Sequence, residues 1–545
     1  MTSAADFPPK WFKISGPILL IFAAAIGYLA WRARDLDDLT RKWVVNEISA
    51  RFQSQVELGS LHVTLLPHVG VTGHDLVVHF HDRTDVPPLV RVDSFQFNLG
   101  VLDVLRAPKH LHSATVQHMT ISIPPRTQNK PGEQSASAKK EHVVPSVIVD
   151  ELVSDDADLI IYSKNPKKDP LEWDIHRLVL RYASVNKPFS FQGTLTNAKP
   201  IGEIATNGSY GPWDLDDPGS TPVSGTYKFA DADLGPFPGI AGILSSAGTF
   251  SGELSELQTE GETDTPDFSL DKVGKPVPLH TEFSATVDGT NGDTLLHPVR
   301  ATLVRSLILA EGSVTNVPHE GHNISLDVGA PNARIQDILA LAINSDKPMM
   351  TGVVKIKAKL VLPPGKAKTL DKLLLDGQFG LDDAKWTSPE IREKLESLSR
   401  HGEGKPSDED AGSSVSDLHG TFHLEKGVIH FSSLTFSVPG AAIDLAGTYD
   451  IREGRLDFNG HLRLQAKLSQ TVTGAKSFLL KAFDPFFKKD GAGAVLPISI
   501  TGTRENPAFG VSVFHKAIKK QMGDTEKKPD GSKKQDAEKP SSKPN

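Results

Sequence analysis

Residues 421–465, TFHLEKGVIHFSSLTFSVPGAAIDLAGTYDIREGRLDFNGHLRLQ, decide the fold class of this chain. Apolar and polar residues alternate along the stretch. Because successive side chains of a strand point to opposite faces, the alternation predicts strands with one apolar and one polar face. The apolar residues assigned to the buried face are Phe431, Leu434, Phe436, Ile443, Leu445, Leu456, Phe458, Leu462 and Leu464.

The turns of this stretch are marked by glycine. Gly427, Gly440 and Gly454 each follow one or two polar or proline residues between apolar runs. Glycine adopts the positive φ that short hairpin turns require, so these positions predict hairpins. Ser432 and Ser433 shift the parity of the alternation, which predicts a β-bulge. The stretch therefore predicts an antiparallel meander.

The rest of the chain largely repeats this pattern. Alternating segments punctuated by glycine run from residue 56 to 123 and from 143 to 328. With strands of ordinary length, roughly 25 to 30 strands are expected. Alternation alone is equally compatible with one curled sheet and with two ordinary β-sandwiches, because both bury one apolar face.

Composition excludes several classes of protein. The chain has 545 residues, 38% of them hydrophobic, so disorder throughout is excluded. A net charge of −8 argues against a nucleic-acid partner. The absence of cysteine excludes disulfides, thiol nucleophiles and Cys-ligated zinc, and it suits an oxidising compartment.

An uncharged segment, ISGPILLIFAAAIGYLAW, occupies residues 14–31. As a helix it would span about 27 Å, close to the thickness of a bilayer core. The small residues that would suit signal-peptide cleavage, Ala23 to Ala25, lie inside the apolar run. We therefore predict an uncleaved transmembrane anchor.

Four shorter segments have helical patterns. An apolar stripe over residues 37–51 predicts an amphipathic helix that either lies on a membrane or covers the sheet. A second helix is expected within residues 333–343, and a third begins at Ser388-Pro389, where a hydroxyl N-cap precedes a first-turn proline. The fourth, residues 475–487, is aromatic and basic. This helix either closes one end of the sheet or contacts a membrane surface. The candidates for the membrane contact are Phe478, Phe483, Phe486, Phe487, Lys488 and Lys489.

No catalytic motif is present. Nucleophile elbows, phosphate loops and dinucleotide fingerprints are missing, and we predict no enzymatic activity, no catalytic residue and no cofactor. His79 with His81, and His110 with His112, would share strand faces and could hold a metal. Because no third ligand has a recognisable spacing, no metal site is predicted.

Two segments carry a family resemblance. VELGSLHVTLLPHVGVTGHDLVV, at residues 56–78, follows a membrane span and a short helix, and FFKKDGAGAVLPISITGTRENPAFGVSV occupies residues 486–513. In this order around a β-rich middle they resemble the AsmA-like family of bacterial envelope proteins, which is related to TamB-like bridge lipid-transfer proteins. The two matches cover about a third of the chain.

The resemblance implies a fold and a role. The fold is mainly β: an N-terminal transmembrane helix, then a long curled antiparallel sheet forming a taco-like groove, with a few short capping helices. The role is envelope biogenesis in a diderm bacterium, by a single-pass inner-membrane protein with most of its chain in the periplasm. It would carry phospholipid along the groove toward the outer membrane, and the nine apolar residues named above, from Phe431 to Leu464, are the candidates for the lining of that groove. The implied partners are phospholipid, the inner membrane, and the outer membrane or its assembly proteins.

Orientation and function both have alternatives. Lys10 and Lys13 precede the span and four basic residues follow it within residues 32–42, so the positive-inside rule alone would place the large region in the cytoplasm. The resemblance and the lack of cysteine favour the periplasm instead. The alternative functions are a periplasmic scaffold for outer-membrane protein assembly, with a closed core and no lipid conduit, and an enzyme with an unrecognised site.

These patterns predict eight regions. They are a cytoplasmic N-terminus (1–13), the anchor (14–31), an AsmA-like N-terminal region (32–123), a flexible linker (124–142), a β-rich middle groove (143–330), a helix-interrupted segment with a polar loop (331–413), a C-terminal AsmA-like β region (414–514) and a disordered tail (515–545).

Overall fold

The computed structural model describes most of the chain between residues 36 and 511. The described residues are 36–64, 69–81, 83, 85–99, 109–125, 147–198, 200–237, 239–270, 274–343, 345, 347–406, 416–471, 493–504 and 506–511. The predicted anchor, most of the linker, the aromatic-basic segment and the tail lie outside them. The described chain is mainly β, with 26 strands, within the range that the sequence predicts.

The described residues divide into two compact units. The first extends to Phe379 and includes Leu424–Lys426, and the second contains the remainder from Gly380. The boundary between the two units falls within the strand β20 (Leu374–Trp386). None of the eight predicted regions begins or ends there.

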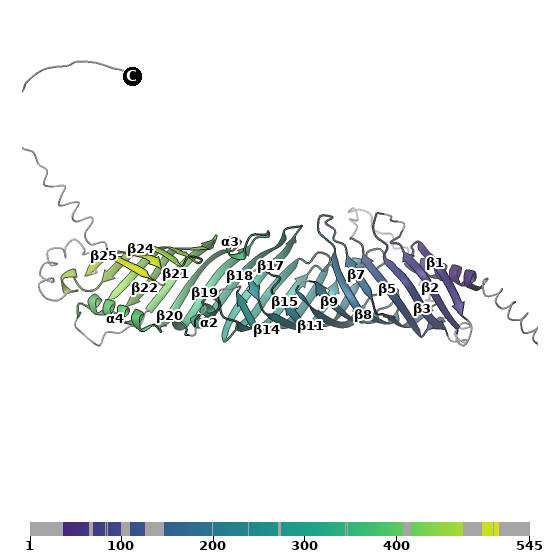
Figure 1. Ribbon diagram of the computed structural model, residues 1–545, viewed down its shortest axis with the longest axis horizontal. Helices are drawn as coiled ribbons and strands as arrows, with labels where there is room; N and C mark the ends of the chain where they lie inside the picture. The colour runs from purple at the N-terminus through teal and green to yellow at the C-terminus, as the bar shows by residue number, and fades with distance from the viewer. Residues whose placement is uncertain are drawn as a thin grey trace, which may run out of the picture. The chain divides into compact units, whose positions relative to one another are not determined.

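The first unit contains a helix at residues 36–52 and the strands from β1 to β19 (Figure 1). The strands are β1 (Val56–Thr64), β2 (Val69–Val78), β3 (Val90–Leu99), β4 (Lys109–Leu111), β5 (Ser113–Ile123), β6 (Val147–Ser154), β7 (Ala157–Ile161), β8 (Leu171–Ala183), β9 (Phe189–Ala198), β10 (Ile201–Tyr210), β11 (Pro222–Asp233), β12 (Ile240–Ala241), β13 (Ile243–Glu253), β14 (Glu256–Leu270), β15 (Val277–Val287), β16 (Thr294–Leu303), β17 (Ser306–Val317), β18 (Gly321–Arg334) and β19 (Met350–Leu362). The short helices α2 (Ile335–Ala342) and α3 (Thr369–Lys372) follow β18 and β19.

The second unit combines one helix with the C-terminal strands. They are α4 (Pro389–Glu403), β21 (Ser416–Glu425), β22 (Val428–Val438), β23 (Ala441–Asp450), β24 (Arg455–Leu464), β25 (Ala494–Thr503) and β26 (Pro507–Val511). From β22 to β26 each strand pairs antiparallel with the next, which confirms the predicted meander.

The predicted turns and bulge of this unit are confirmed. Gly427, Gly440 and Gly454 have φ values of 78°, 78° and 64°. The register between β22 and β23 shifts between Phe431 and Leu434, at the two serines that change the parity.

The ladder of the first unit is antiparallel except at one step. β5 pairs parallel with β6 and β7, whereas its other neighbour β3 is antiparallel to it. Two parallel strands need a long connection, because the chain must return to the side of the sheet on which the first strand begins. Residues 124–146, which contain the predicted linker, make that connection. From β7 onward, neighbouring strands pair antiparallel again.

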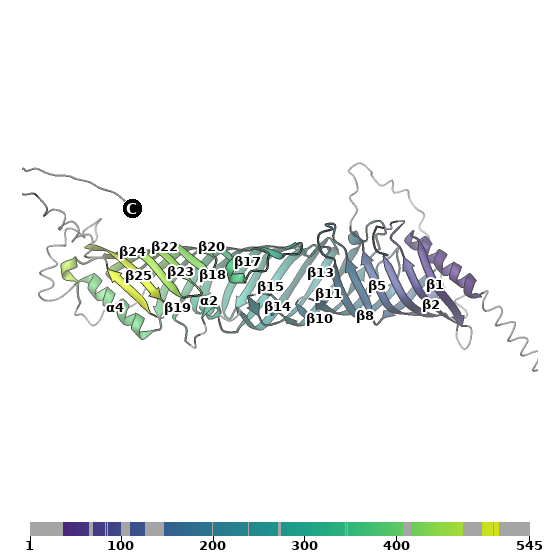
Figure 2. The same cartoon turned by 45° about the horizontal axis from the view of Figure 1, so that its top comes forward.

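The helix predicted over residues 37–51 is confirmed, and it covers the sheet. Val44 is buried in a core with Leu58, Val71 and Phe95, and Trp43 packs against the same core. Figure 2 shows this helix beside β1 and β2.

The helices α2 and α4 also lie where the sequence predicts, whereas the one-turn helix α3 was not predicted. Ser388 occupies the N-cap of α4 and Pro389 its first turn, but the Ser388 hydroxyl makes no capping hydrogen bond, so the predicted role of that hydroxyl is wrong. Proline already fixes the first φ of the helix and lacks one of the N–H groups that a cap would satisfy.

Candidate functional site

The helix at residues 36–52 is tied to the strands below it by polar contacts. The Arg41 guanidinium donates to the Leu58 carbonyl, with Nε at 3.0 Å. The Asp37 carboxylate accepts from the Val63 amide at 2.8 Å. Both partners belong to β1, so the helix is held against the first strand of the sheet at two places.

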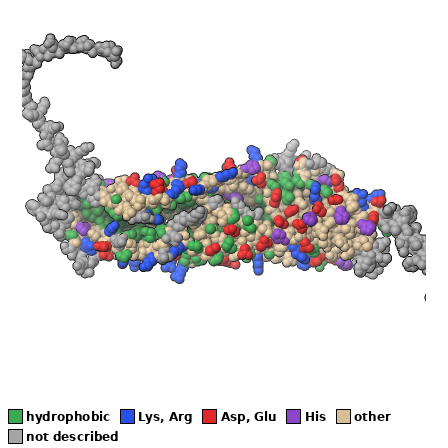
Figure 3. Space-filling model, in the orientation of Figure 1, with side chains coloured by type: hydrophobic (Ala, Val, Ile, Leu, Met, Phe, Trp, Pro, Cys, Tyr) green, Lys and Arg blue, Asp and Glu red, His purple; other side chains and the backbone are tan. Residues whose placement is uncertain are grey.

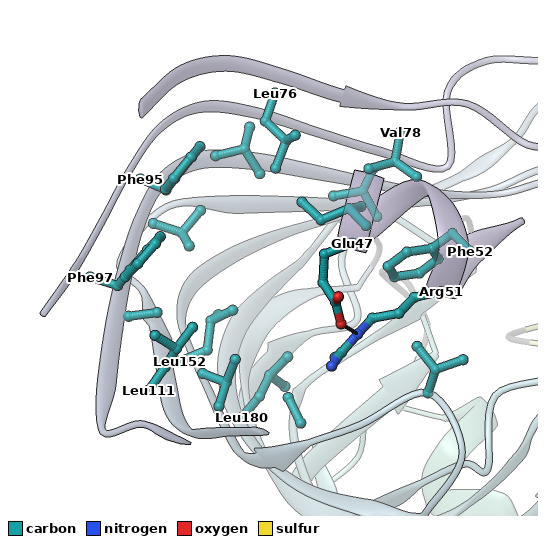
Figure 4. A pocket seen from close by; sticks show the side chains of 18 of the residues that line it. Glu47, Arg51, Phe52, Leu76, Val78, Phe95, Phe97, Leu111, Leu152 and Leu180 are labelled. Atoms are coloured by element: carbon teal, nitrogen blue, oxygen red, sulfur yellow. Dashed lines mark hydrogen bonds and ion pairs between the residues drawn. The ribbon is translucent and has the colours of Figure 1, made fainter. Parts of the chain in front are cut away.

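An apolar cavity of about 320 Å³ lies between this helix and the curved inner face of the sheet (Figure 4). The helix forms one wall, and the strands β2 to β6, β8 and β9 contribute to the others. Almost the whole wall is aliphatic or aromatic. Its members include Ile48, Leu76, Val78, Phe95, Phe97, Leu111, Val116, Leu152 and Leu180. A cavity of this character takes hydrocarbon and offers very little to a polar ligand.

One charged pair stands in the cavity. Glu47 and Arg51 lie one helical turn apart and form an ion pair, with Arg51 Nε 3.0 Å from Glu47 Oε1. Figure 4 shows both side chains directed into the hollow. Their side chains are 21–24% exposed, which places the pair where the apolar interior meets water. The site thus combines a hydrocarbon-lined interior with a charged group at its edge.

An aromatic cluster borders the same cavity. Phe52 contacts Trp213 edge to face, with ring centroids 5.5 Å apart, and Trp213 contacts Tyr210 at 5.7 Å. Tyr210 also packs on Phe189. Burial raises the pKa of Tyr210 to about 12, so this phenol stays neutral at physiological pH. The cluster connects the end of the helix to the turn after β10 by apolar contact.

The residues of this cavity are not among the site residues that the sequence predicts. Their signal was present in the alternation of 69–78, 90–99 and 113–123 and in the apolar stripe of the helix. Each pattern indicates a buried face. Only the packing of the helix over β1 to β8 leaves a space between those faces.

The residues assigned to the groove in residues 421–465 lie together on one face of the second unit. Leu434 pairs in register with Leu445, and Phe436 with Ile443, which in turn pairs with Leu462. Ile443, Leu445, Phe458, Leu462 and Leu464 are buried, and Phe431, Leu434, Phe436 and Leu456 are half-buried. Around β22, Figure 3 shows hydrophobic side chains gathered in a hollow.

Several histidines of the first unit lie on its surface (Figure 3), and some of them contact acidic side chains. His79 contacts Glu57 at 3.1 Å, and His112 contacts Asp150 at 3.0 Å. His81 instead contacts the Leu215 carbonyl, so His79 and His81 have different partners. Among the side chains that the structure describes, no three His, Asp or Glu residues are arranged to hold a metal ion.

Two predicted sites fall outside the described residues. They are the anchor at residues 14–31 and the membrane-contact candidates from Phe478 to Lys489. Within the part of the chain that the structure covers, none of the helices is both long and apolar enough to span a bilayer.

Comparisons with known proteins gave no relative. No protein-family model, no curated protein and no solved structure matches this chain.

Proposed function

We propose that this chain is a single-pass inner-membrane protein of envelope biogenesis that carries phospholipid, along an apolar groove of its sheet, through the periplasm toward the outer membrane. The cavity beneath the helix at residues 36–52 is the observation that carries the proposal. Its lining is almost entirely hydrocarbon and has one ion pair at its edge. The AsmA-like resemblance of residues 56–78 and 486–513 supports the same role.

The physical basis is the cost of exposing an acyl chain to water, about 0.8 kcal/mol for each CH₂ group. A chain that moves from a bilayer into an apolar cavity keeps its hydrocarbon environment, so the barrier to transfer is small. The proposal assigns no covalent step and no cofactor to this protein.

The test is to look for lipid in the purified full-length protein and to fill the cavity. We expect mass spectrometry to find co-purified phospholipid. Leu152→Trp places a larger side chain in the cavity and should reduce the bound lipid several-fold. Leu295→Trp is the matched control, because Leu295 is 51% exposed on β16 and should tolerate the change. Equal lipid content in the two variants would refute the cavity as the lipid site.

A second candidate function is the periplasmic scaffold with a closed core. Its support is the burial of Phe458, Leu462 and Leu464 in the second unit, where side chains of the protein itself occupy the apolar face. The two functions differ in the effect of Phe458→Asp. In an open groove the variant should stay folded and lose lipid. In a closed core a buried, unpaired carboxylate should unfold the second unit.

A further inference from the structure

The strands of the first unit end in two rows of turns, one along each side of the sheet. These two rows of turns contact each other. In an antiparallel ladder, successive turns lie alternately on the two sides. Because β5 and β7 are parallel, both strands end on the same side, and the alternation shifts by one strand. The turns after β2, β7 and β11 therefore lie on one side, which we call the first rim. The turns after β10, β15, β17 and β19 lie on the opposite side, the second rim.

Three groups of contacts join the rims. Near the helix, His81 on the first rim contacts the Leu215 carbonyl on the second at 3.0 Å. Farther along, Lys168 Nζ on the first rim lies 3.0 Å from both carboxylate oxygens of Asp293 on the second. Beyond that, Gly239 on the first rim lies against the side chain of Thr369 on the second.

The spacing of these contacts describes a rolled sheet. Seven pairing steps separate β7 from β15. At about 4.8 Å per step, and with strands of about 11 residues at about 3.3 Å each, the path from one rim to the other is roughly 50 Å. Closing that path gives a tube with a backbone diameter of about 16 Å. Side chains fill the interior of so narrow a tube, unless it holds one small ligand. Figures 1 and 2 show strands running obliquely, as such a roll requires.

The Lys168–Asp293 pair is the most enclosed of the polar contacts. The Lys168 side chain is only 9% exposed, although it belongs to a surface turn. Asp293 also accepts the Asn316 amide at 2.7 Å, which fixes the carboxylate on the second rim. By contrast, the neighbouring pair of Asp169 and His319 is exposed. Asp169 follows Lys168 on the first rim, and His319 lies on a neighbouring turn of the second. Their side chains are 76% and 71% exposed and 3.8 Å apart.

We propose that Lys168 and Asp293 form a gate across the seam between the rims, and that the gate opens when the polar headgroup of an amphipathic cargo passes. This inference rests on the proposed lipid transport. The tube is too narrow to enclose a headgroup beside acyl chains, so the headgroup must travel in the seam and meet this pair. The contacts between the rims are polar or involve small side chains, so water can replace them when the rims separate.

A reversible cross-link tests the gate, and the absence of native cysteine makes the cross-link specific. The full-length protein with Lys168→Cys and Asp293→Cys is placed in vesicles of phosphatidylethanolamine and phosphatidylglycerol. Because the native contact joins the tips of two side chains, the cysteines are linked by a bis-methanethiosulfonate reagent, which spans a longer distance than a direct disulfide. Transfer of a fluorescent phosphatidylethanolamine to acceptor vesicles is then followed before cross-linking, after cross-linking and after reduction. The control carries Asp264→Cys and His280→Cys, which pair in register on neighbouring strands and face outward.

We expect the reagent to join the two cysteines across the seam and to lower the transfer rate at least tenfold, with full recovery on reduction. The control cross-link should leave the rate unchanged. Transfer that continues at the same rate beneath the closed seam would overturn the gate and leave lipid transport standing. Failure of the two cysteines to be joined would show that the rims are apart and would overturn the gate. A protein that transfers no lipid in any state would refute the proposed function and the gate with it.

Discussion

Phe431 and Phe458 meet across β23, with their ring centroids 5.7 Å apart. They belong to β22 and β24, and both pair in register with Gly447 on the strand between them. Glycine has no side chain at this position, so the two rings close over its backbone. This contact places an aromatic pair at the centre of the face that the sequence assigned to the groove.

Gly447→Ala should destabilise the second unit by about 1–3 kcal/mol, because a Cβ there would overlap the backbone of Asp457 and Phe458. Hydrogen exchange of peptides from residues 421–465 measures the local free energy of opening. Ala446→Gly is the companion variant, since Ala446 is exposed on the opposite face. Its cost should be no more than that of a glycine in a strand, about 0.5–1 kcal/mol. An equal loss from both variants would contradict the packing explanation.

Phe458→Ala should lower the free energy of opening of the same strands by about 3–5 kcal/mol, because the ring is 6% exposed and its removal leaves a cavity. The same hydrogen-exchange measurement applies. His461→Ala, on the exposed face of β24, should change protection little. Unchanged protection in Phe458→Ala would indicate that the ring faces an open groove.

His280 should titrate above the ordinary range for histidine. Its Nδ1 lies 2.7 Å from Asp264, and this hydrogen bond raises the pKa of His280, while slight burial acts in the opposite direction. The stabilisation is therefore fully present below the unfolded-state pKa of about 6.5 and is lost as pH rises through the higher folded-state pKa. Since both side chains are more than a third exposed, it should not exceed about 1 kcal/mol.

NMR titration of the His280 ring measures this directly, and Asp264→Asn should lower the pKa toward the ordinary value. An unchanged titration in Asp264→Asn would show that the carboxylate does not act on the imidazole.

The predicted anchor at residues 14–31 leads to an expectation for cell fractionation. Full-length protein should be recovered with the inner membrane, and a chain beginning at Asp35 should be recovered without it. A reporter fused after Asn545 tests the orientation. A periplasmic reporter should be active in that fusion, whereas activity of a cytoplasmic reporter alone would reverse the orientation and remove the basis for transport toward the outer membrane.

The sequence by itself determined the strands of the second unit, their turns and their bulge. Alternation fixes which face of a strand is apolar, and Gly427, Gly440 and Gly454 fix where the chain reverses, because both effects act between residues close in sequence. The helix at residues 36–52 was predictable for the same reason, from its apolar stripe.

Only the tertiary structure decided what those elements enclose. The cavity depends on how the helix at residues 36–52 lies over strands as far away as β8, and the parallel step depends on where the chain returns after β5. The ion pair of Lys168 with Asp293 joins residues 125 positions apart. Periodicity carries no information about such contacts, because the curl and tilt of the sheet within the first unit bring its rims together.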